Sequence, residues 1–170
     1  ALALKWKKAG FRSLKIKGGI DIESDIERII RVREAIGRGI SLRFDANGGF
    51  TVEQAVQFIR RTQEVGIELL EQPTKRENQE LLKQVSQRVS VPVMADESLM
   101  TLKDVFHLMQ NDCTDMVNVK LMKVGGIAEA MHINSVAKAA SVETMIGCMD
   151  ESALAISAGL HFALACGNVI

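Results

Sequence analysis

Three carboxylates follow short apolar runs at nearly regular intervals. Asp45, Glu71 and Asp96 end the runs ISLRFD, IELLE and VPVMAD, and they lie 26 and 25 residues apart. Carboxylates without histidine or thiolate are hard oxygen ligands, which suit Mg²⁺ or Mn²⁺ in octahedral geometry and leave positions for water and substrate oxygens. Any one of them alone could instead cap a helix or pair with a surface base. The series of three indicates a divalent metal site.

Lysines stand on either side of this acidic series. Lys15 and Lys17 belong to SLKIK, where alternation places them on the same face of a strand, and Lys120 is expected to share a face with Asn118 and Met122. Inward lysines at a strand end are costly unless anions or chemistry hold them there. A neighbouring ammonium and partial burial disfavour the charged form of a lysine, so Lys15 would tune Lys17 toward neutrality. The alternative is an exposed strand with two snorkelling lysines.

Apolar runs alternate with amphipathic segments along the whole chain. Helical spacing of apolar residues predicts two helices around 22–36 and 52–65, the second begun by a capping box of Thr51 and Gln54. Further helices are expected at 77–88, 101–110, 126–140 and 152–165. Strands are expected at 13–17, 40–47, 67–73, 91–98, 115–123 and 143–152. This alternation predicts βαβ units and an α/β fold with a parallel sheet buried on both faces.

A charge stands at or near the end of each expected strand. The series is Lys17, Asp45, Glu71, Asp96, Lys120 and then Asp150 or Glu151. It repeats at a period of about 26 residues, as one structural unit per repeat would. In a barrel of parallel strands all the carboxyl ends meet at one mouth, so charges far apart in sequence converge. A doubly wound open sheet would bring fewer of them to one point, and the pattern therefore favours the barrel.

Composition argues against several classes of partner. The 170 residues carry 21 basic and 21 acidic side chains, which does not fit nucleic acid or anionic membrane as the main partner. The chain is 47% apolar, enough for one domain with a sizeable core. Three cysteines without CxxC or zinc spacing are expected to be reduced, buried thiols of a cytoplasmic protein. No run reaches the roughly 18 apolar residues of a membrane span, and a signal-peptide pattern is absent.

Five motifs together carry a family resemblance. KIK, DAN, EQP, ADES and VKLMKVGG occur in the order, and at the strand ends, in which the enolase superfamily has them on the second to sixth strands of its (β/α)8 barrel. The lysines of KIK and VKLMKVGG resemble the muconate-lactonizing subgroup. The mandelate racemase subgroup would place a catalytic histidine on the seventh strand, and ETMIGCMDES has none. The segment NVKLMKVGG is most similar to dipeptide epimerases of the L-Ala-D/L-Glu type.

The resemblance implies roles for the residues already singled out. Mg²⁺, or Mn²⁺ in its place, would be held by Asp45, Glu71 and Asp96. Lys17 and Lys120 would be acid/base groups on opposite faces of the substrate, with Lys15 assisting electrostatically. Lys120 is favoured over Lys123, which is expected to belong to the turn before Gly125. The implied reaction is epimerisation of a dipeptide through an enediolate, and the alternative is a lyase similar to muconate cycloisomerase or o-succinylbenzoate synthase.

Weaker candidates for contact with ligands or substrate lie near the same strand ends. Asn47 shares a face with Asp45, but it precedes two glycines and can equally be a turn residue. Glu97 would pair with a strand-end lysine, Lys120, or face the helices. At the seventh strand, the candidates for pocket lining are Cys148, Met149 and Asp150, and a core thiol, a core thioether and a helix cap are the alternative roles.

The chain departs from the full family pattern at both ends. Residues 1–170 are expected to form an incomplete barrel of about strands two to seven, without the N-terminal capping domain and the last strand. An unclosed barrel would expose two parallel edges. The chain is therefore expected to be a piece of a longer protein, homo-oligomeric when complete. The alternative from another class is a non-catalytic barrel fragment that needs a complementing segment.

Overall fold

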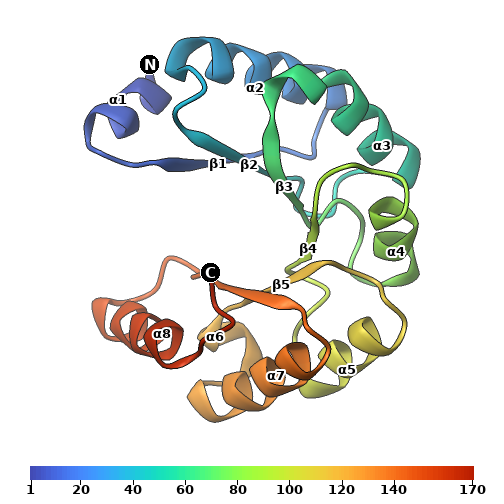
Figure 1. Cartoon of the computed structure of the whole chain (residues 1–170), viewed down its shortest axis with the longest axis vertical. Coiled ribbons are helices and arrows are strands. Elements are labelled where there is room, and N and C mark those ends of the chain that lie inside the picture. The colour runs from blue at the N-terminus through green and yellow to red at the C-terminus, as the bar shows by residue number, and fades with distance from the viewer. The chain divides into compact units, whose positions relative to one another are not determined.

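Three parallel strands organise the first of two units in the chain. The computed structural model describes residues 1–170, which divide into Ala1–Val93 and Met94–Ile170. In the first unit β1 (Ser13–Lys17) pairs with β2 (Ser41–Asp45), and β2 pairs with β3 (Ile67–Glu71) (Figure 1). The helical segments of this unit are α1 (Leu2–Lys8), α2 (Ile22–Ile36), α3 (Val52–Arg61), the 3-10 helix η1 (Gln63–Val65) and α4 (Glu80–Ser86).

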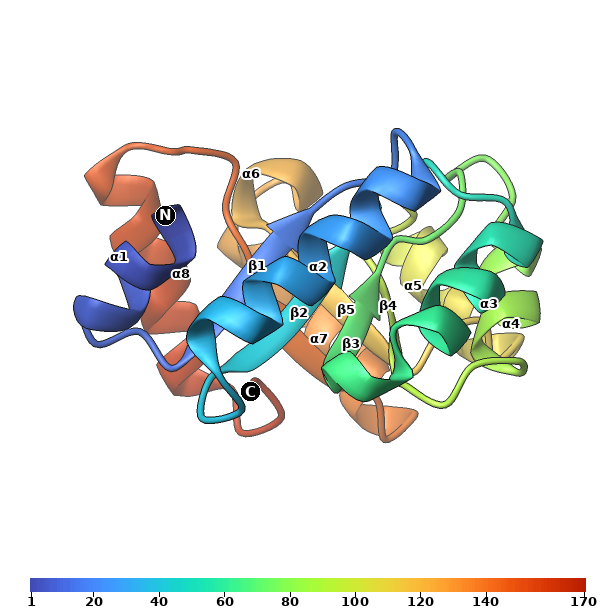
Figure 2. The same ribbon diagram turned by 90° about the horizontal axis from the view of Figure 1, so that it is seen from above.

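The helices of the first unit cover the apolar face of its strands. Figures 1 and 2 show α2 and α3 along one side of β1 to β3. Leu42 and Phe44 of β2 are fully buried, and the ring of Phe44 lies 4.3 Å from that of Phe58 on α3. Because side chains alternate along a strand, Arg43 and Asp45 face the other side of the sheet. Apolar burial thus anchors β2 while its polar residues remain on the opposite face.

Side-chain caps begin the two long helices of this unit. Asp21 accepts a hydrogen bond from the backbone N–H of Ser24 at the start of α2. Thr51 and Gln54 form the reciprocal capping box predicted for α3. Each cap satisfies backbone donors that the first helical turn leaves without partners. The helices therefore begin shortly after the strands that precede them, which keeps the connecting turns short.

The second unit repeats the βα arrangement. β4 (Val93–Ala95) begins at the boundary between the units and pairs with β5 (Met116–Val119), which pairs in parallel with β6 (Glu143–Ile146). Its helices are α5 (Leu102–Gln110), α6 (Leu121–Val124), α7 (Ile127–Ala139) and α8 (Ala153–Ala165). β4 and β5 are buried along their whole length, as expected of parallel strands with both faces covered.

The end of β5 differs from the prediction. The strand stops at Val119, and residues 121–124 form the short helix α6, so Met122 does not share a strand face with Asn118 and is 69% exposed. Gly125 ends the helix in the left-handed conformation, φ +98°, and its N–H and that of Gly126 both donate to the carbonyl of Leu121. A glycine adopts this conformation without the Cβ clash of other residues, which favours a tight turn over a continued strand.

The cysteines follow the prediction in part. None of the three cysteines forms a disulfide, and Cys113 and Cys166 are buried. Cys148 is exposed, so the expectation of a buried thiol is wrong there. The residue follows β6 by two positions and lies in the loop before α8, outside the packed strand.

None of the helices of this chain combines the length and the apolar character that crossing a membrane requires.

Candidate active site

The register of the first unit brings three polar residues level with one another. Lys17 of β1 lies opposite Asp45 of β2, and Asp45 lies opposite Glu71 of β3. An irregularity in β2 between Leu42 and Arg43 shifts its pairing with β3 by one residue, and this shift makes Asp45 level with Glu71. Asp45 and Glu71 are completely buried, with carboxylate oxygens within 4.8 Å of each other. Two anions so close in a buried place require a cation.

Lys15 supplies a cation to this pair in the structure. Its Nζ donates to both oxygens of Glu71 at 2.9 Å and lies 3.1 Å from Asp45 Oδ2. Burial alone would lower the pKa of Lys15, but the charges of Glu71 and Asp45 and their hydrogen bonds outweigh it and raise that pKa above 10.5. Lys15 is therefore a full cation at neutral pH. It can act on charges at this end of the sheet and is unsuited to accept a proton.

Lys17 is the more exposed of the two lysines on β1. Its side chain is 62% exposed, and its Nζ lies 3.2 Å from Asp45 Oδ2 and 3.5 Å from Asn47 Oδ1. Asn47 has φ +45°, which fits its expected turn role, and its backbone N–H also donates to Asp45 Oδ1 at 2.9 Å. Asn47 thus contacts both a strand-end carboxylate and a strand-end lysine. An exposed amine beside a buried carboxylate is placed to meet a ligand from solvent.

The turns after β1 and β2 pack against each other so closely that only glycine fits. A Cβ on Gly19, whose φ is +94°, would lie 1.8 Å from the carbonyl oxygen of Ala46. A Cβ on Gly49 would lie 1.8 Å from the carbonyl oxygen of Gly19. The absence of side chains at both positions lets the two backbones touch. This contact fixes how near Lys17 stands to Asp45.

A second cluster of opposite charges ends β4 and β5 in the second unit. Asp96 is completely buried, and its Oδ2 accepts from Lys120 Nζ at 2.5 Å while its Oδ1 accepts from Lys123 Nζ at 2.6 Å. Lys123 also donates to the carbonyl oxygens of Asp96 and Asn118. Burial would raise the pKa of Asp96, but the two ammonium groups hold it below its usual value. Asp96 is therefore an anion at neutral pH, paired with two lysines.

Lys123 is the residue that sequence reasoning did not place in this cluster. It belongs to the turn before Gly125, as expected, but its side chain is only 6% exposed and returns to Asp96. Burial lowers the pKa of Lys123, and Asp96 offsets part of that effect. The spacing from Lys120 to Lys123 is three residues, which puts both on one side of a helical turn. The paired glycines could have indicated the turn that ends α6, but the contact with Asp96 joins residues 27 apart and depends on the fold.

Glu97 acts on the same cluster through its charge. Lys120 pairs with Asp96, and the charge of Glu97 offsets part of the lowering of the Lys123 pKa that burial causes. Glu97 is half-buried. It therefore contributes to the electrostatics of this cluster through Lys123.

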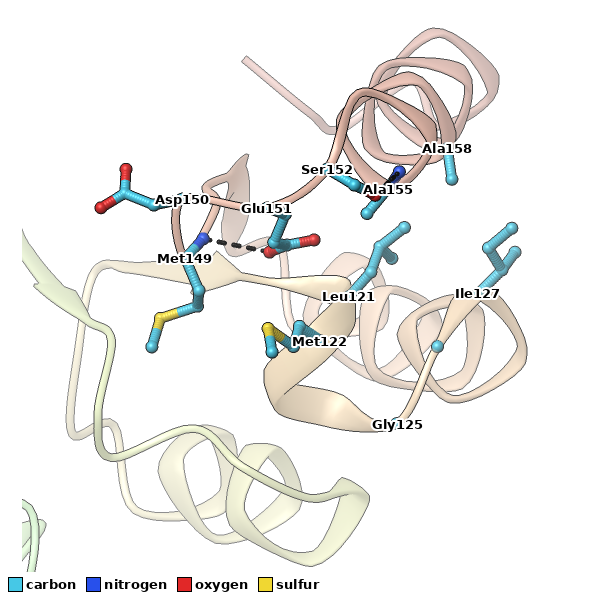
Figure 3. Close-up of a pocket in the computed structure, with 11 residues that line it drawn as sticks. Leu121, Met122, Gly125, Ile127, Met149, Asp150, Glu151, Ser152, Ala155 and Ala158 are labelled. Carbon is cyan, nitrogen blue, oxygen red and sulfur yellow. Dashed lines mark hydrogen bonds between the residues drawn. The ribbon is translucent and has the colours of Figure 1, made fainter.

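The loop after β6 lines a hollow of about 720 Å³ in the second unit. Met149 and Asp150 are among its lining residues, together with α6, the start of α7 and the start of α8 (Figure 3). Figure 3 shows the Asp150 carboxylate pointing away from the other lining side chains, while Glu151 accepts a hydrogen bond from the backbone N–H of Met149 at 3.0 Å. Cys148 instead borders a smaller hollow of about 300 Å³ along α8.

Because Lys15 is charged and paired in the folded state, the free energy of unfolding of the metal-free protein is expected to depend on pH. The folded pKa of Lys15 lies above the unfolded value of 10.5, so its stabilisation is fully present below pH 10.5 and is lost as the pH rises through the folded pKa. We expect Lys15→Met to cost about 2–3 kcal/mol at pH 7, because two buried carboxylates lose a partner. Urea unfolding in a chelator, at several pH values, should show this cost shrinking only above pH 10.5.

The control for this measurement is Lys8→Met, since Lys8 is exposed and forms no ion pair among the chain's salt bridges. Its effect on the free energy of unfolding should be small and constant with pH. A Lys15→Met cost that declines between about pH 8 and 10 would contradict a raised pKa.

Parallel βα units whose strands end in buried carboxylates and lysines are typical of α/β folds that carry polar sites at the carboxyl ends of their strands. The chain belongs to the enolase C-terminal domain-like family, whose family model matches residues 1–170. The predicted superfamily and fold class are thereby confirmed.

Individual relatives are dipeptide epimerases. The chain is 45% identical over 168 residues to the hydrophobic dipeptide epimerase of Enterococcus faecalis, covering 98% of this chain and 48% of that protein. It is 43% identical over 170 residues to the L-Ala-D/L-Glu epimerase of Bacillus subtilis, covering 98% of this chain and 46% of the relative. The chain therefore spans about half the length of these curated relatives.

A solved relative includes both metal and ligand. The crystal structure of the Enterococcus faecalis dipeptide epimerase complexed with Mg and the dipeptide L-Leu-L-Tyr has a TM-score of 0.97 to this chain and 44% identity. The match covers 99% of this chain and 48% of that one.

Proposed function

We propose that the protein carrying this chain is a Mg²⁺-dependent dipeptide epimerase. The observation that carries the proposal is that each unit ends a strand with a lysine beside a buried carboxylate, Lys17 beside Asp45 and Lys120 beside Asp96. Inversion of a carbon by proton transfer needs two such groups, one for each face of the substrate. The names of the relatives support the same activity.

The metal would be held by Asp45, Glu71 and Asp96. These residues fit Mg²⁺ because each offers a carboxylate at a strand end and all three are completely buried. Asp45 and Glu71 already share the positive charge of Lys15, so this place favours a cation. Asp96 accepts hydrogen bonds from Lys120 and Lys123 in this structure, and a metal would share its carboxylate with these lysines. When bound, Mg²⁺ would stabilise negative charge that develops on the substrate carboxylate.

The lysines would move the proton. A proton next to a carboxylate is very weakly acidic, because its removal leaves an enediolate with charge on both oxygens. Lys17 or Lys120 would take this proton, depending on which isomer is bound, and the other lysine would return a proton to the opposite face. Lys15, a full cation beside Glu71 and Asp45, would assist electrostatically by keeping a fixed positive charge near Lys17.

The substrate class is a dipeptide with a free carboxylate. The relatives are named for different dipeptides, among them hydrophobic, L-Ala-D/L-Glu and L-Lys-D/L-Arg pairs. Met149 and Asp150 are proposed to meet the substrate from the loop after β6, with Cys148 beside them. Asn47 would orient Asp45 and Lys17 by its contacts with both, and Glu97 would act through Lys123.

The experiment is incubation of L-Ala-L-Glu and L-Leu-L-Tyr with the protein and Mg²⁺ in D₂O, followed by NMR. We expect one α-proton of a dipeptide to be replaced by deuterium while the epimer accumulates, and both changes to stop when a chelator removes Mg²⁺. Formation of an elimination product would favour a lyase instead. Turnover that continues in the chelator would contradict the proposed metal role.

A further inference from the structure

An ion pair on α2, between a buried aspartate and a partly exposed arginine, holds the backbone around Lys17. Asp25 is 1% exposed, and its Oδ2 accepts a hydrogen bond from the backbone N–H of Gly19 at 2.7 Å. Its Oδ1 accepts from Arg28 Nη1 at 2.9 Å, and the same Nη1 donates to the carbonyl oxygen of Lys17 at 2.8 Å. Two neighbouring turns of one helix thus hold the main chain on both sides of Gly18.

Burial of the charged Asp25 side chain costs free energy. Asp25 does not contact the strand-end carboxylates, so its burial needs another explanation. A buried carboxylate is tolerated only where it is paired and hydrogen-bonded. Both oxygens of Asp25 are used, one by the backbone after Lys17 and one by the arginine that binds the carbonyl of Lys17. Every polar contact of the pair therefore leads to the Lys17–Gly19 turn or lies within the pair.

The side chain of Lys17 has little else to fix its position. It is 62% exposed, and its contacts with Asp45 and Asn47 are 3.2 and 3.5 Å long. The backbone at this point is fixed more firmly, because the N–H of Gly18 donates to the carbonyl oxygen of Asp45 at 2.8 Å in addition to the two ties from α2. The main chain that carries Lys17 is consequently held at three points, and this determines where the side chain starts and how far its amine can reach.

We infer that Asp25 and Arg28 are positioning residues for Lys17, and that they aim its amine at one face of the substrate. The inference rests on the proposed function, in which Lys17 and Lys120 serve opposite faces. Arg28 acts through a backbone carbonyl, so its loss would leave the amine of Lys17 and the second-unit cluster of Asp96, Lys120 and Lys123 chemically unchanged. Loss of Arg28 should therefore slow proton transfer on the substrate face served by Lys17 and leave proton transfer on the face served by Lys120 unchanged.

The test measures the two faces separately. In D₂O with Mg²⁺, each isomer of the dipeptide loses its α-proton to the lysine that faces it, and ¹H NMR follows this loss for both isomers. Lys17→Ala identifies the isomer that depends on Lys17. We expect Arg28→Met to slow exchange of that isomer at least tenfold and to change exchange of the other less than twofold. Arg28→Lys, which can restore one donor, should recover part of the loss.

A matched control comes from the same helix. Arg31 is 78% exposed and pairs with Glu27 at 3.4 Å, so Arg31→Met should leave both exchange rates unchanged. Arg28 is itself 47% exposed, which favours a folded variant, and thermal unfolding of each variant provides a check. A loss of folded protein would slow both isomers by the same factor.

The outcomes are distinct. Equal slowing of both isomers by an Arg28→Met or Arg28→Lys variant that thermal unfolding shows to be folded, or no slowing of either isomer, would overturn the positioning role while leaving the proposed function in place. Absence of α-proton exchange for both isomers of L-Ala-L-Glu and of L-Leu-L-Tyr in the unsubstituted protein would overturn the proposed function and this inference with it. Selective slowing in Arg28→Met that Arg28→Lys partly reverses would establish the role.

Discussion

Replacement of either Lys17 or Lys120 by alanine is expected to slow epimerisation in both directions by about 10²- to 10⁴-fold, the usual contribution of a positioned acid or base. Inversion passes through both lysines whichever isomer is the substrate, so removal of one blocks both directions. Circular dichroism or polarimetry of the dipeptide, started from each isomer in turn, measures the two rates. Both substitutions should be made in the whole protein that contains this chain.

The same two variants should differ in isotope exchange. Lys17→Ala keeps Lys120, so one isomer should still exchange its α-proton with D₂O without inversion, and Lys120→Ala should show the same for the opposite isomer. Lys103→Ala is a suitable control, because Lys103 is exposed on α5. Two variants that each keep both directions of epimerisation would exclude the two-base mechanism.

Much of the strand-end chemistry could be predicted because it depends on local patterns. Alternation alone placed Lys15 and Lys17 on one face of β1, and the structure has them contacting the same carboxylate, Asp45. The apolar runs located all six strands, since a parallel strand buried on both faces needs an almost continuous apolar sequence. The charges of the first five runs then lie at the strand end or one residue after it. The sixth prediction is wrong, because β6 ends at Ile146 and both Asp150 and Glu151 lie in the loop that follows.

Other features depend on contacts that a local pattern does not contain. The register shift between Leu42 and Arg43, which makes Asp45 level with Glu71, arises only where β2 meets β3. The return of Lys123 to Asp96 depends on the chain turning at Gly125 instead of continuing β5. Such features are set by tertiary packing, so one sequence without its fold does not reveal them.

Glu71→Ala is expected to reduce Mg²⁺ affinity by at least about 100-fold, since even residues that only orient metal ligands contribute about 10–100-fold. Glu71 is completely buried at the end of β3, and in the absence of metal it holds Lys15 with both oxygens. Its loss removes one of three proposed ligands and leaves Asp45 to neutralise the lysine alone. Isothermal titration calorimetry with Mg²⁺ measures the affinity directly.

The matched control is Glu68→Ala on the same strand. Glu68 is 44% exposed and pairs with Arg43 at 2.7 Å, away from the strand end, so its removal should leave Mg²⁺ affinity unchanged. Because a ligand that binds only the folded state stabilises it, Mg²⁺ should raise the melting temperature of the unsubstituted protein and of Glu68→Ala but not of Glu71→Ala. Full Mg²⁺ affinity in Glu71→Ala would mean that the ion is held elsewhere, and the lysines would then pair with these carboxylates for structural reasons alone.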